Sequence, residues 1–495
     1  MSRIIIQNGN MCELDLPLKF AQKLYNEFAI RHPNAFYLRT RQRGMQNWDG
    51  KIHYITKTGQ FKIGLLPKVY DMCIEMGIKP KVVDMRQPLP KVSKVVTNIG
   101  KYKLRPEQEK AVKAVINNKI GNTPFHIGVL DYTVNAGKTL IMSSLYLSYK
   151  KQLKTLLITN DSDWLNQARE EFKQYLPGED ITFVQGKVLN WSNFTIGMVQ
   201  SISRNMRFYQ KELSQIDMVL IDEADQGGSK QYQNVITRLF NTRIRIGLSG
   251  TIYMSKLAKD RVKNMNLECF FGKVIAEFKL KDSIKKGYST KTVVKMVPGK
   301  PWYGNWKSDC ISYKEIYDDS ITNCYTAWLM AYNRLRWNIN QGRYPALVVC
   351  KHIAHCENLY KFFKKKLGDA YNIAYVHVNT PSKLRQQIMK DFREGKIDIL
   401  VSTTIIARGK NFPKLRYLLN AASMDSQEKS IQFLGRLVRT DKSKKKVYLD
   451  DLHYPGPYLD RHGKHRKQYY QRQELKVILL DKLWKKHPNH SLIKS

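Results

Sequence analysis

Hydrophobic residues along the chain gather in short, nearly uninterrupted runs, and the segments between many of these runs have helical spacing of apolar residues. Such runs, separated by helices, are typical of strands in a parallel sheet. The earlier runs are 127–130, 155–159, 195–199, 217–222 and 245–251. The later runs are 346–350, 374–378, 397–401 and 417–421. The pattern predicts two successive α/β domains, each built on a doubly wound parallel sheet.

Ahead of these runs, residues 1–90 have the pattern of a small, separate α/β unit. Residues 16–30 show helical spacing of apolar side chains, and residues 51–55 are β-prone. The pair Asp49-Gly50 between short β-prone segments predicts a tight hairpin turn.

The boundaries between the expected domains follow from composition. Residues 86–100 carry prolines and little periodicity, which predicts a linker. A long helix is expected over residues 312–338, and the chain beyond residue 455 is dense in Lys, Arg, His and Tyr. The expected division is a small α/β domain (1–90), a first sheet domain (101–285), a second sheet domain (286–455) and a basic tail (456–495).

Composition supports globular domains and points to a polyanionic partner. Hydrophobic residues make up 42% of the 495-residue chain, so each domain can bury a core. Apolar runs are too short for a transmembrane helix, and the N-terminus turns polar too soon for a signal peptide. The formal net charge of +42 exceeds what solubility requires, so we expect nucleic acid, not a membrane surface, as the partner.

The seven cysteines are scattered along the chain, and no Cys-x-x-Cys pair occurs among them. This spacing indicates neither a zinc site nor a disulfide framework. A reducing compartment such as the cytoplasm fits this usage.

One turn between a strand and a helix has the composition of a phosphate-binding loop. The stretch Thr133-Val-Asn-Ala-Gly-Lys-Thr139 follows the run 127–130 and leads into an apolar helix. Backbone N–H groups of such a turn and the helix N-terminus bind phosphate oxygens. Lys138 would reach the β- and γ-phosphates of ATP, and the Thr139 hydroxyl would hold Mg²⁺. Because Tyr132 stands where the full pattern has Gly, an ordinary turn and helix start is the alternative.

Upstream, Leu104-Arg-Pro-Glu-Gln108 opens an amphipathic helix. Gln108 suits the amide-like edge of adenine, and Tyr102 or Arg105 suits stacking on the base, although a Gln at a helix start is usually just solvated. The nucleotide-binding residues expected from both stretches are Arg105, Gln108, Asn135, Ala136, Gly137, Lys138 and Thr139.

Two carboxylates end the apolar run 217–222. Asp222 would hold Mg²⁺ and Glu223 would orient or deprotonate the attacking water, because a P-loop lies upstream with strands between. The alternative is a strand followed by an acidic helix start. The next run ends in Ser249 and Thr251, which would sense the γ-phosphate.

A further candidate lies in the second sheet domain, which has no P-loop of its own. Arg436 and Arg439 are three residues apart, so they share one side of a helix. Such an arginine stabilises charge on a transferred phosphoryl group. Without the P-loop, a basic helix facing DNA or solvent would be the better interpretation.

In the N-terminal unit, Arg39, Arg41 and Arg43 lie near Trp48. Cations beside an aromatic ring suit phosphate contact with base stacking. For the arginines nucleic acid is favoured, whereas Trp48 filling a small core is slightly favoured over stacking. Gln200, directly after the run 195–199, is a further candidate contact.

Taken together, these stretches resemble the superfamily-two helicases and translocases. The resemblance covers residues 101 to about 452, and its motifs occur in the family order: Leu104 to Gln108, Ala136 to Thr139, Asp222 to Asp225, Ser249 to Thr251, Ser402 to Pro413, and Gln432 to Arg439. It implies two RecA-like domains with ATP between them and nucleic acid across the top. It also implies that Arg436 and Arg439 face the γ-phosphate, with Arg439 the better candidate for the arginine finger, and adds Gly409 to the nucleotide-binding residues.

Two subfamilies compete. The Asp222-Glu-Ala-Asp225 box and Ala407-Arg-Gly409 look like DEAD-box RNA helicases, but Gln432-Phe433 replaces the His-Arg of that family and Asn411 replaces its usual Asp. The form Gln-x-x-Gly-Arg-x-x-Arg looks like the DNA-acting groups. Residues 41–52, followed by Gly64-Leu-Leu-Pro67, are similar to the N-terminal domain of bacteriophage UvsW-type helicases, which remodel branched DNA.

We therefore expect a monomeric, ATP- and Mg²⁺-dependent DNA helicase or translocase that acts on single-stranded and branched duplex DNA. The alternatives are an RNA helicase on the same core, and an ATP-gated nucleic-acid binding or annealing protein that does not translocate.

Overall fold

The computed structural model describes residues 2–41, 44–149, 152–186, 191–253, 260–299, 312–407, 412–441 and 443–480. The chain divides into two compact units. One consists of Met1–Tyr132 and Ala136–Phe278, and the other of Thr133–Asn135 and Lys279–Ser495. Among the helices in these ranges, none combines the length and apolar character needed to cross a membrane.

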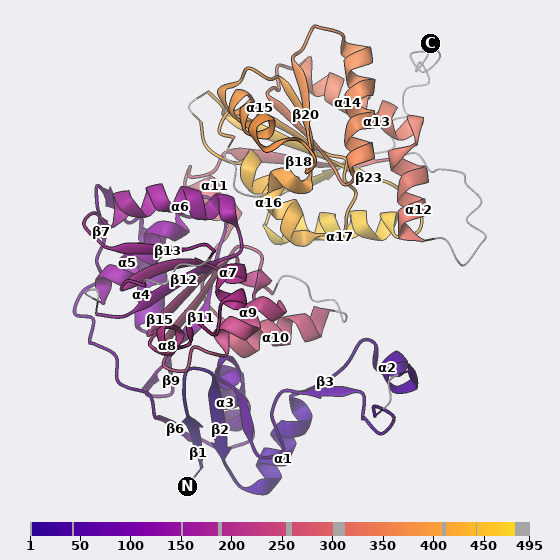
Figure 1. Cartoon of the computed structure of the whole chain (residues 1–495). Coiled ribbons are helices and arrows are strands. Elements are labelled where there is room, and N and C mark those ends of the chain that lie inside the picture. The colour runs from indigo at the N-terminus through magenta and orange to yellow at the C-terminus, as the bar shows by residue number, and fades with distance from the viewer. Residues whose placement is uncertain are drawn as a thin grey trace. The chain divides into compact units, whose positions relative to one another are not determined.

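The first unit contains a seven-stranded sheet in which every neighbouring pair of strands is parallel. Its strands, in spatial order, are β13 (Ile181–Val184), β14 (Phe194–Met198), β12 (Thr155–Thr159), β15 (Met218–Asp222), β16 (Ile244–Ser249), β11 (His126–Tyr132) and β17 (Val274–Phe278). Its helices are α4 (Pro106–Ile116), α5 (Lys138–Ser148), α6 (Ser162–Tyr175), α7 (Val199–Arg204), α8 (Gln210–Ser214), α9 (Lys230–Ile236) and α10 (Arg261–Phe271). Helices cover both faces (Figure 1), so the strands are apolar on both sides, which explains their continuous hydrophobic runs.

The second unit repeats this architecture with another fully parallel seven-stranded sheet. Its strands, in spatial order, are β20 (Ile373–Val376), β21 (Ile399–Thr403), β19 (Ala346–Cys350), β22 (Tyr417–Asn420), β23 (Lys446–His453), β18 (Lys291–Pro298) and β24 (Val477–Leu479). Its helices are α11 (Leu280–Lys285), α12 (Tyr313–Tyr317), α13 (Tyr325–Ile339), α14 (Ile353–Leu367), α15 (Ser382–Glu394), α16 (Gln427–Leu437) and α17 (Leu459–Arg472). The helix expected over residues 312–338 is interrupted by a π-helical turn, Asp318–Thr322, between α12 and α13.

The expected basic tail is partly wrong, because residues 459–479 belong to the second unit. Helix α17 packs against α16 and β23, and β24 pairs with β18 at the sheet edge. Arg466 in this segment is fully buried and forms an ion pair with Asp451 at 2.8 Å. The basic composition of this segment therefore reflects a buried ion pair as well as a solvated face.

Residues 1–90 form a smaller α/β fold around a four-stranded mixed sheet. The strands, in spatial order, are β5 (Gln60–Lys62), β2 (Met11–Asp15), β1 (Arg3–Ile6) and β6 (Lys81–Asp84), with helices α1 (Leu18–Glu27) and α3 (Leu66–Glu75). An arm extends from this fold (Figure 1). It consists of β3 (Ala29–Arg31), α2 (Ala35–Arg41) and β4 (Lys51–His53), and β3 pairs antiparallel with β4. The expected tight turn at Asp49-Gly50 is wrong, because the whole of α2 lies between the two paired strands.

The N-terminal fold is not separate from the first parallel sheet, since both contribute to one continuous hydrophobic core. Arg245 on β16 is fully buried, and its guanidinium donates hydrogen bonds to the Gly9 carbonyl (2.6 Å) and to Asn10 Oδ1 (2.8 Å). On the neighbouring helix α10, Asn266 Oδ1 accepts a hydrogen bond from the Tyr54 hydroxyl at 3.0 Å. These contacts fix the N-terminal fold to the sheet that carries the P-loop.

Candidate functional site

The predicted P-loop joins the carboxyl end of β11 to the N-terminus of α5. Gly137 immediately precedes α5 with φ of 71°, and Asn135 has φ of 64°. Asn tolerates this left-handed conformation better than most residues, which accounts for Asn135 where Gly is more usual. A Cβ at position 137 would overlap the Gln108 side chain, so the loop requires glycine here. The first N–H groups of α5 are thus available for an anion at the sheet edge.

Helix α4 is tied to the P-loop through Gln108, which is buried. Its Oε1 accepts from the Arg105 backbone N–H (2.8 Å), and its Nε2 donates to the Ala136 carbonyl (2.8 Å). The Arg105 side chain pairs with Glu107 at 3.1 Å. Gln108 therefore positions the loop, and a contact of Gln108 or Arg105 with adenine stays a prediction.

Tyr132 explains the missing glycine of the P-loop pattern. Its side chain is fully buried in the sheet, and its hydroxyl donates to the Glu107 carbonyl at 2.8 Å. Burial raises the pKa of this hydroxyl, so it stays protonated and keeps its role as a donor. The tyrosine thus joins β11 to α4 from inside the core.

The carboxyl end of β15 brings a carboxylate to the P-loop lysine. Lys138 Nζ lies 3.7 Å from Asp222 Oδ1, and Asp222 is buried. Burial raises the pKa of Asp222, and the positive charge of Lys138 opposes that shift. Within the described residues, Asp222 Oδ1 has no hydrogen-bond partner. A buried carboxylate oxygen with spare acceptor capacity, beside a phosphate-binding loop, fits a divalent cation shared with a phosphate.

Glu223 follows Asp222 with φ of 53°, an uncommon conformation for a side chain of this size. The turn directs the chain out of β15 into a short helical segment, Ala224–Gln226. Strain of this kind is often found where a side chain must be aimed at a reacting group. The conformation is consistent with the predicted role of Glu223, which stays a prediction.

The predicted sensors at the end of β16 contact the carboxylates after β15. The Ser249 hydroxyl donates to Asp225 Oδ1 at 2.6 Å, and the Ser249 and Thr251 hydroxyl oxygens lie 3.1 Å apart. Because β15 and β16 are adjacent, this hydrogen bond joins the carboxyl ends of the two strands.

The two arginines predicted in the second unit differ in their local structure. Arg436 lies in the last turn of α16, whereas Arg439 lies beyond the helix, since α16 ends at Leu437. The expectation that both occupy one side of a single helix is therefore wrong. Helix α16 begins after Ser426, whose hydroxyl accepts from the Lys429 N–H.

Two lysines at the carboxyl edge of the second sheet, Lys351 and Lys429, were not singled out from the sequence. Lys429 Nζ donates to the Thr404 hydroxyl at 3.3 Å, and Lys351 follows β19 directly. Burial lowers the pKa of Lys351, and the charge of Lys429 lowers it further, so the two cations are near one another. Only their position near the end of a strand or helix could have identified these residues from the sequence. A single lysine in a basic chain has no other distinguishing feature.

The predicted nucleic-acid residues of the N-terminal unit lie on the arm. Arg39 and Arg41 occupy the last turn of α2, and the Arg41 guanidinium stacks over the exposed Tyr37 ring at 4.8 Å. Trp48 is half-buried against His32, and its indole N–H donates to the Lys51 carbonyl at 2.9 Å. This supports the structural interpretation of Trp48. Phe36 is 80% exposed beside Arg39 along a surface cavity of about 510 Å³, and sequence reasoning missed it.

Three other predicted residues are less informative. Gln200 lies in α7 at the carboxyl end of β14, and its Nε2 donates to the Asn160 carbonyl at 3.4 Å. Arg43 and Gly409 lie outside the described residues.

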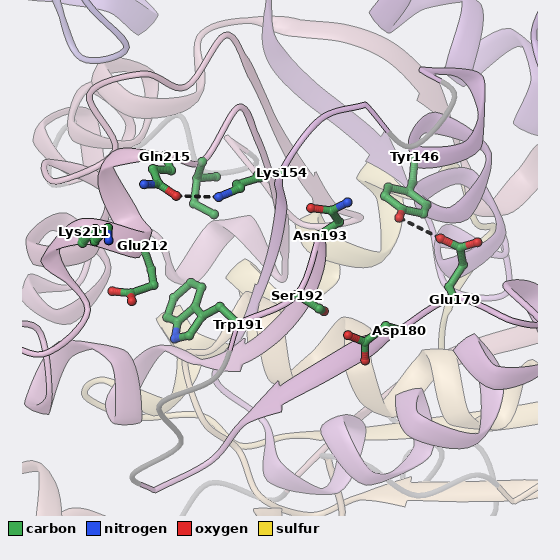
Figure 2. A pocket seen from close by; sticks show the side chains of 11 residues that line it. Tyr146, Lys154, Glu179, Asp180, Trp191, Ser192, Asn193, Lys211, Glu212 and Gln215 are labelled. Carbon is green, nitrogen blue, oxygen red and sulfur yellow. Dashed lines mark hydrogen bonds between the residues drawn. The ribbon is translucent and has the colours of Figure 1, made fainter.

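A separate cavity of about 750 Å³ opens at the opposite edge of the first sheet (Figure 2). It lies at the amino ends of the strands, beside Lys154, Asn193 and Ile216, whereas the P-loop follows a carboxyl end. Its lining mixes acidic and basic side chains, and Tyr146 donates to Glu179 across it at 2.9 Å (Figure 2). The cavity is therefore distinct from the candidate nucleotide site.

Comparison with known proteins supports the same interpretation. Residues 101–254 match the family described as "Type III restriction enzyme, res subunit", and residues 331–441 match "Helicase conserved C-terminal domain". The chain is 22% identical over 452 residues to the ATP-dependent DNA helicase uvsW of Enterobacteria phage T4, which covers 82% of both chains. It is 23% identical over 385 residues to helicase 22 of a Sulfolobus islandicus filamentous virus, covering 71% of this chain and 64% of that relative.

Among solved structures, a fragment of an HsdR subunit of a type I restriction enzyme from Vibrio vulnificus YJ016 has the same fold. It matches with a TM-score of 0.55 and 16% identity, over 76% of this chain and 67% of that one. The structure has two parallel sheets and a P-loop beside a carboxylate at a strand end. The two domain matches follow one another in the same order along the chain. The chain belongs to the superfamily-two ATP-dependent helicases.

Proposed function

We propose that the chain is a DNA helicase or translocase that unwinds or branch-migrates branched DNA during recombination, repair or replication restart. The observation that carries this proposal is the approach of Lys138 to the buried Asp222, in a compact unit that also bears an exposed basic arm. The first feature is suited to a nucleotide-driven motor, and the second to gripping a polyanion.

The residues of the proposed nucleotide site have separate roles. ATP with Mg²⁺ supplies the phosphoryl group whose hydrolysis drives the cycle. Lys138 and the first N–H groups of α5 would bind phosphate, and Thr139 and Asp222 would hold the metal ion. Glu223 would accept a proton from the attacking water. Ser249, through Asp225, links the site to the rest of β16.

Two features favour nucleic acid as the substrate, and a third favours DNA. The net charge of +42 suits a polyanionic partner. The arm places Arg39, Arg41 and the exposed Phe36 on one projection, which suits a helix that grips a duplex arm or stacks on an open base. The phage relative that aligns with 82% of this chain is named as a DNA helicase.

The test is the ATPase rate measured without nucleic acid and with single-stranded DNA, fork DNA, four-way-junction DNA and structured RNA. We expect the strongest stimulation by branched DNA. Lys138→Ala and Glu223→Gln should abolish turnover while nucleic-acid binding survives. Lys173→Ala, an exposed lysine on α6, is the matched control and should behave as wild type. Full turnover in both site variants would refute the assignment.

An RNA helicase is the second candidate, favoured by the Asp222-Glu-Ala-Asp225 box and by Ala407-Arg-Gly409. If structured RNA stimulates the ATPase rate and DNA does not, the chain is an RNA helicase and the proposed DNA substrate is wrong. A protein that binds branched DNA tightly and hydrolyses ATP, yet shows no directional strand separation, would instead be an annealing or clamping protein.

A further inference from the structure

A cluster of cations surrounds an exposed tryptophan on the second unit. The Trp337 ring, 43% exposed on α13, has Lys295 Nζ at 4.9 Å, Arg334 Cζ at 5.0 Å and Arg343 Cζ at 4.7 Å from its centre. Arg343 also lies 3.6 Å over the neighbouring Tyr448 ring. Lys446 lies 5.6 Å from that second ring. We call Lys295, Arg334, Trp337, Arg343, Lys446 and Tyr448 the Trp337 cluster.

Positive charge in this cluster is not balanced within the protein. Asp450 pairs with Arg334 at 2.6 Å. Among the described residues, Asp450 is the carboxylate that pairs with a cation of the cluster. Lys295 and Lys446 form no ion pair in the part of the chain that the structure describes. Burial lowers the pKa of Lys295, and although Asp450 opposes this, the charges of Arg334, Arg343 and Lys446 lower it further. The four cations therefore repel one another, and an added anion would relieve the repulsion.

The cations are also held in place before any ligand arrives. Arg334 donates two hydrogen bonds to Asp450 Oδ2, and Arg343 donates to Asn338 Oδ1 at 2.8 Å. Stacking on Trp337 and Tyr448 restricts their remaining freedom. A ligand that binds here does not have to order two long side chains, so less affinity is lost to side-chain entropy.

The cluster does not lie at the carboxyl edge of the second sheet, where Lys351, Thr404 and Lys429 are found. Arg343 precedes β19, and Lys446 is the first residue of β23, whereas Lys295 lies in the middle of β18. The cluster therefore extends from the amino ends of the second sheet to the middle of its strands. Strand β23 has eight residues, which at about 3.3 Å per residue separates the two edges by roughly 26 Å.

We propose that the Trp337 cluster binds the phosphate backbone of a second nucleic-acid segment, an arm of a branched molecule other than the strand held at the carboxyl edge. Arg343, Lys446 and Lys295 contact phosphates, and the exposed part of the Trp337 ring packs against a sugar or a base. Paired cations and aromatic faces at one surface favour nucleic acid over an acidic protein segment. The proposal rests on the proposed function, because it presumes a branched substrate.

The test compares salt dependence of binding for wild type and the double variant Arg343→Gln/Lys446→Gln. The dissociation constant is measured for a fork and for a single-stranded oligonucleotide over a range of salt concentrations. We expect the slope of log affinity against log salt for the fork to become shallower by about 1 for each cation lost, or about 2 in all. The single-strand slope and the ATPase rate stimulated by single strands should not change.

Two controls keep the result interpretable. Lys365→Gln/Lys366→Gln removes the same charge from exposed positions on α14 and should leave both slopes unchanged. Lys446→Gln alone removes one exposed lysine without disturbing Asn338, so its fork slope should change by about 1 while folding is intact.

Four outcomes are decisive. A loss confined to the fork supports the proposal. Equal slopes in variant and wild type, or equal losses on fork and single strand, overturn it. Polyglutamate of matched charge that displaces the fork from wild type but not from the variant would assign the cluster to an acidic protein and also overturn it. Failure of the proposed function is distinguishable, because wild type would then show no ATPase stimulation by any nucleic acid.

Discussion

A buried histidine makes the second unit sensitive to acid. His355 on α14 is 1% exposed, and its Nδ1 lies 3.2 Å from the Tyr317 hydroxyl. That hydroxyl donates its one proton to the Ala422 carbonyl at 3.0 Å, so its oxygen accepts from the Nδ1–H of a neutral imidazole. Burial, and then the nearby His352, lower the pKa of His355 to about 3.

The size of the effect follows from proton linkage. The unfolded chain has a histidine pKa near 6.5, so between that value and about 3 it binds a proton that the folded chain does not. Stability from this group is therefore complete above pH 6.5 and is lost as the pH falls. At pH 5.0 the difference of about 1.5 pH units corresponds to roughly 2 kcal/mol of unfolding free energy.

Urea unfolding of wild type and His355→Gln at pH 7.0 and pH 5.0, followed by circular dichroism, measures this. The wild-type transition of the second unit should lose about 2 kcal/mol more than the variant does on acidification. His126 and His462, whose pKa values are also lowered by burial, are common to both proteins and cancel in the comparison. Equal acid sensitivity of the two proteins would refute the assignment of a neutral, buried His355.

Three further predictions concern the N-terminal fold. Gly64→Ala places a Cβ against the Glu268 carbonyl, so we expect a loss of about 1–3 kcal/mol in urea unfolding; an unchanged midpoint would mean that this contact yields freely. Arg245→Met leaves the Gly9 carbonyl and Asn10 Oδ1 without their donor and should cost about 1–3 kcal/mol and open residues 85–97 to limited proteolysis; wild-type resistance would contradict a rigid attachment. Phe36→Ala should leave folding intact but weaken fork binding by about 1–3 kcal/mol in a titration, and unaltered affinity would exclude stacking by this ring.

The sequence predicted the inner strands of the first sheet, and β19, β21 and β22 of the second, because strands buried on both faces are nearly continuous apolar runs. It missed β18 and β23 for a physical reason. Strand β23 carries Asp450 and Asp451, whose charges are compensated by Arg334 and Arg466, partners distant in sequence. Strand β18 carries Lys295, which interrupts its apolar run. An apolar-run criterion cannot detect a strand whose polar residues are paired in the fold. The edge strands β13, β17 and β24 were missed because they are short or partly solvated.

The candidate nucleotide site was predictable to a similar extent. The spacing of Lys138 and Asp222 relative to their strands placed both at one sheet edge, and the structure brings them together. The hydrogen bonds of the Gln108 side chain were not predictable, because its partners are backbone atoms whose positions depend on the folded loop. Arg439 could not be placed from spacing alone, since the end of α16 between the two arginines depends on tertiary packing.

The attachment of the N-terminal fold through Arg245 also bears on how such a chain can be altered or inherited. A buried guanidinium that is satisfied by Gly9 and Asn10 loses those partners if residues 1–90 are deleted or exchanged. If a different N-terminal fold is attached and Arg245 is kept, the guanidinium lacks hydrogen-bond acceptors. A buried charge without partners then lies on β16, the strand that ends in Ser249. The residue at position 245 and the loop at residues 7–10 should therefore change together. Exchange of the N-terminal fold between homologues should give a folded protein only when both are transferred.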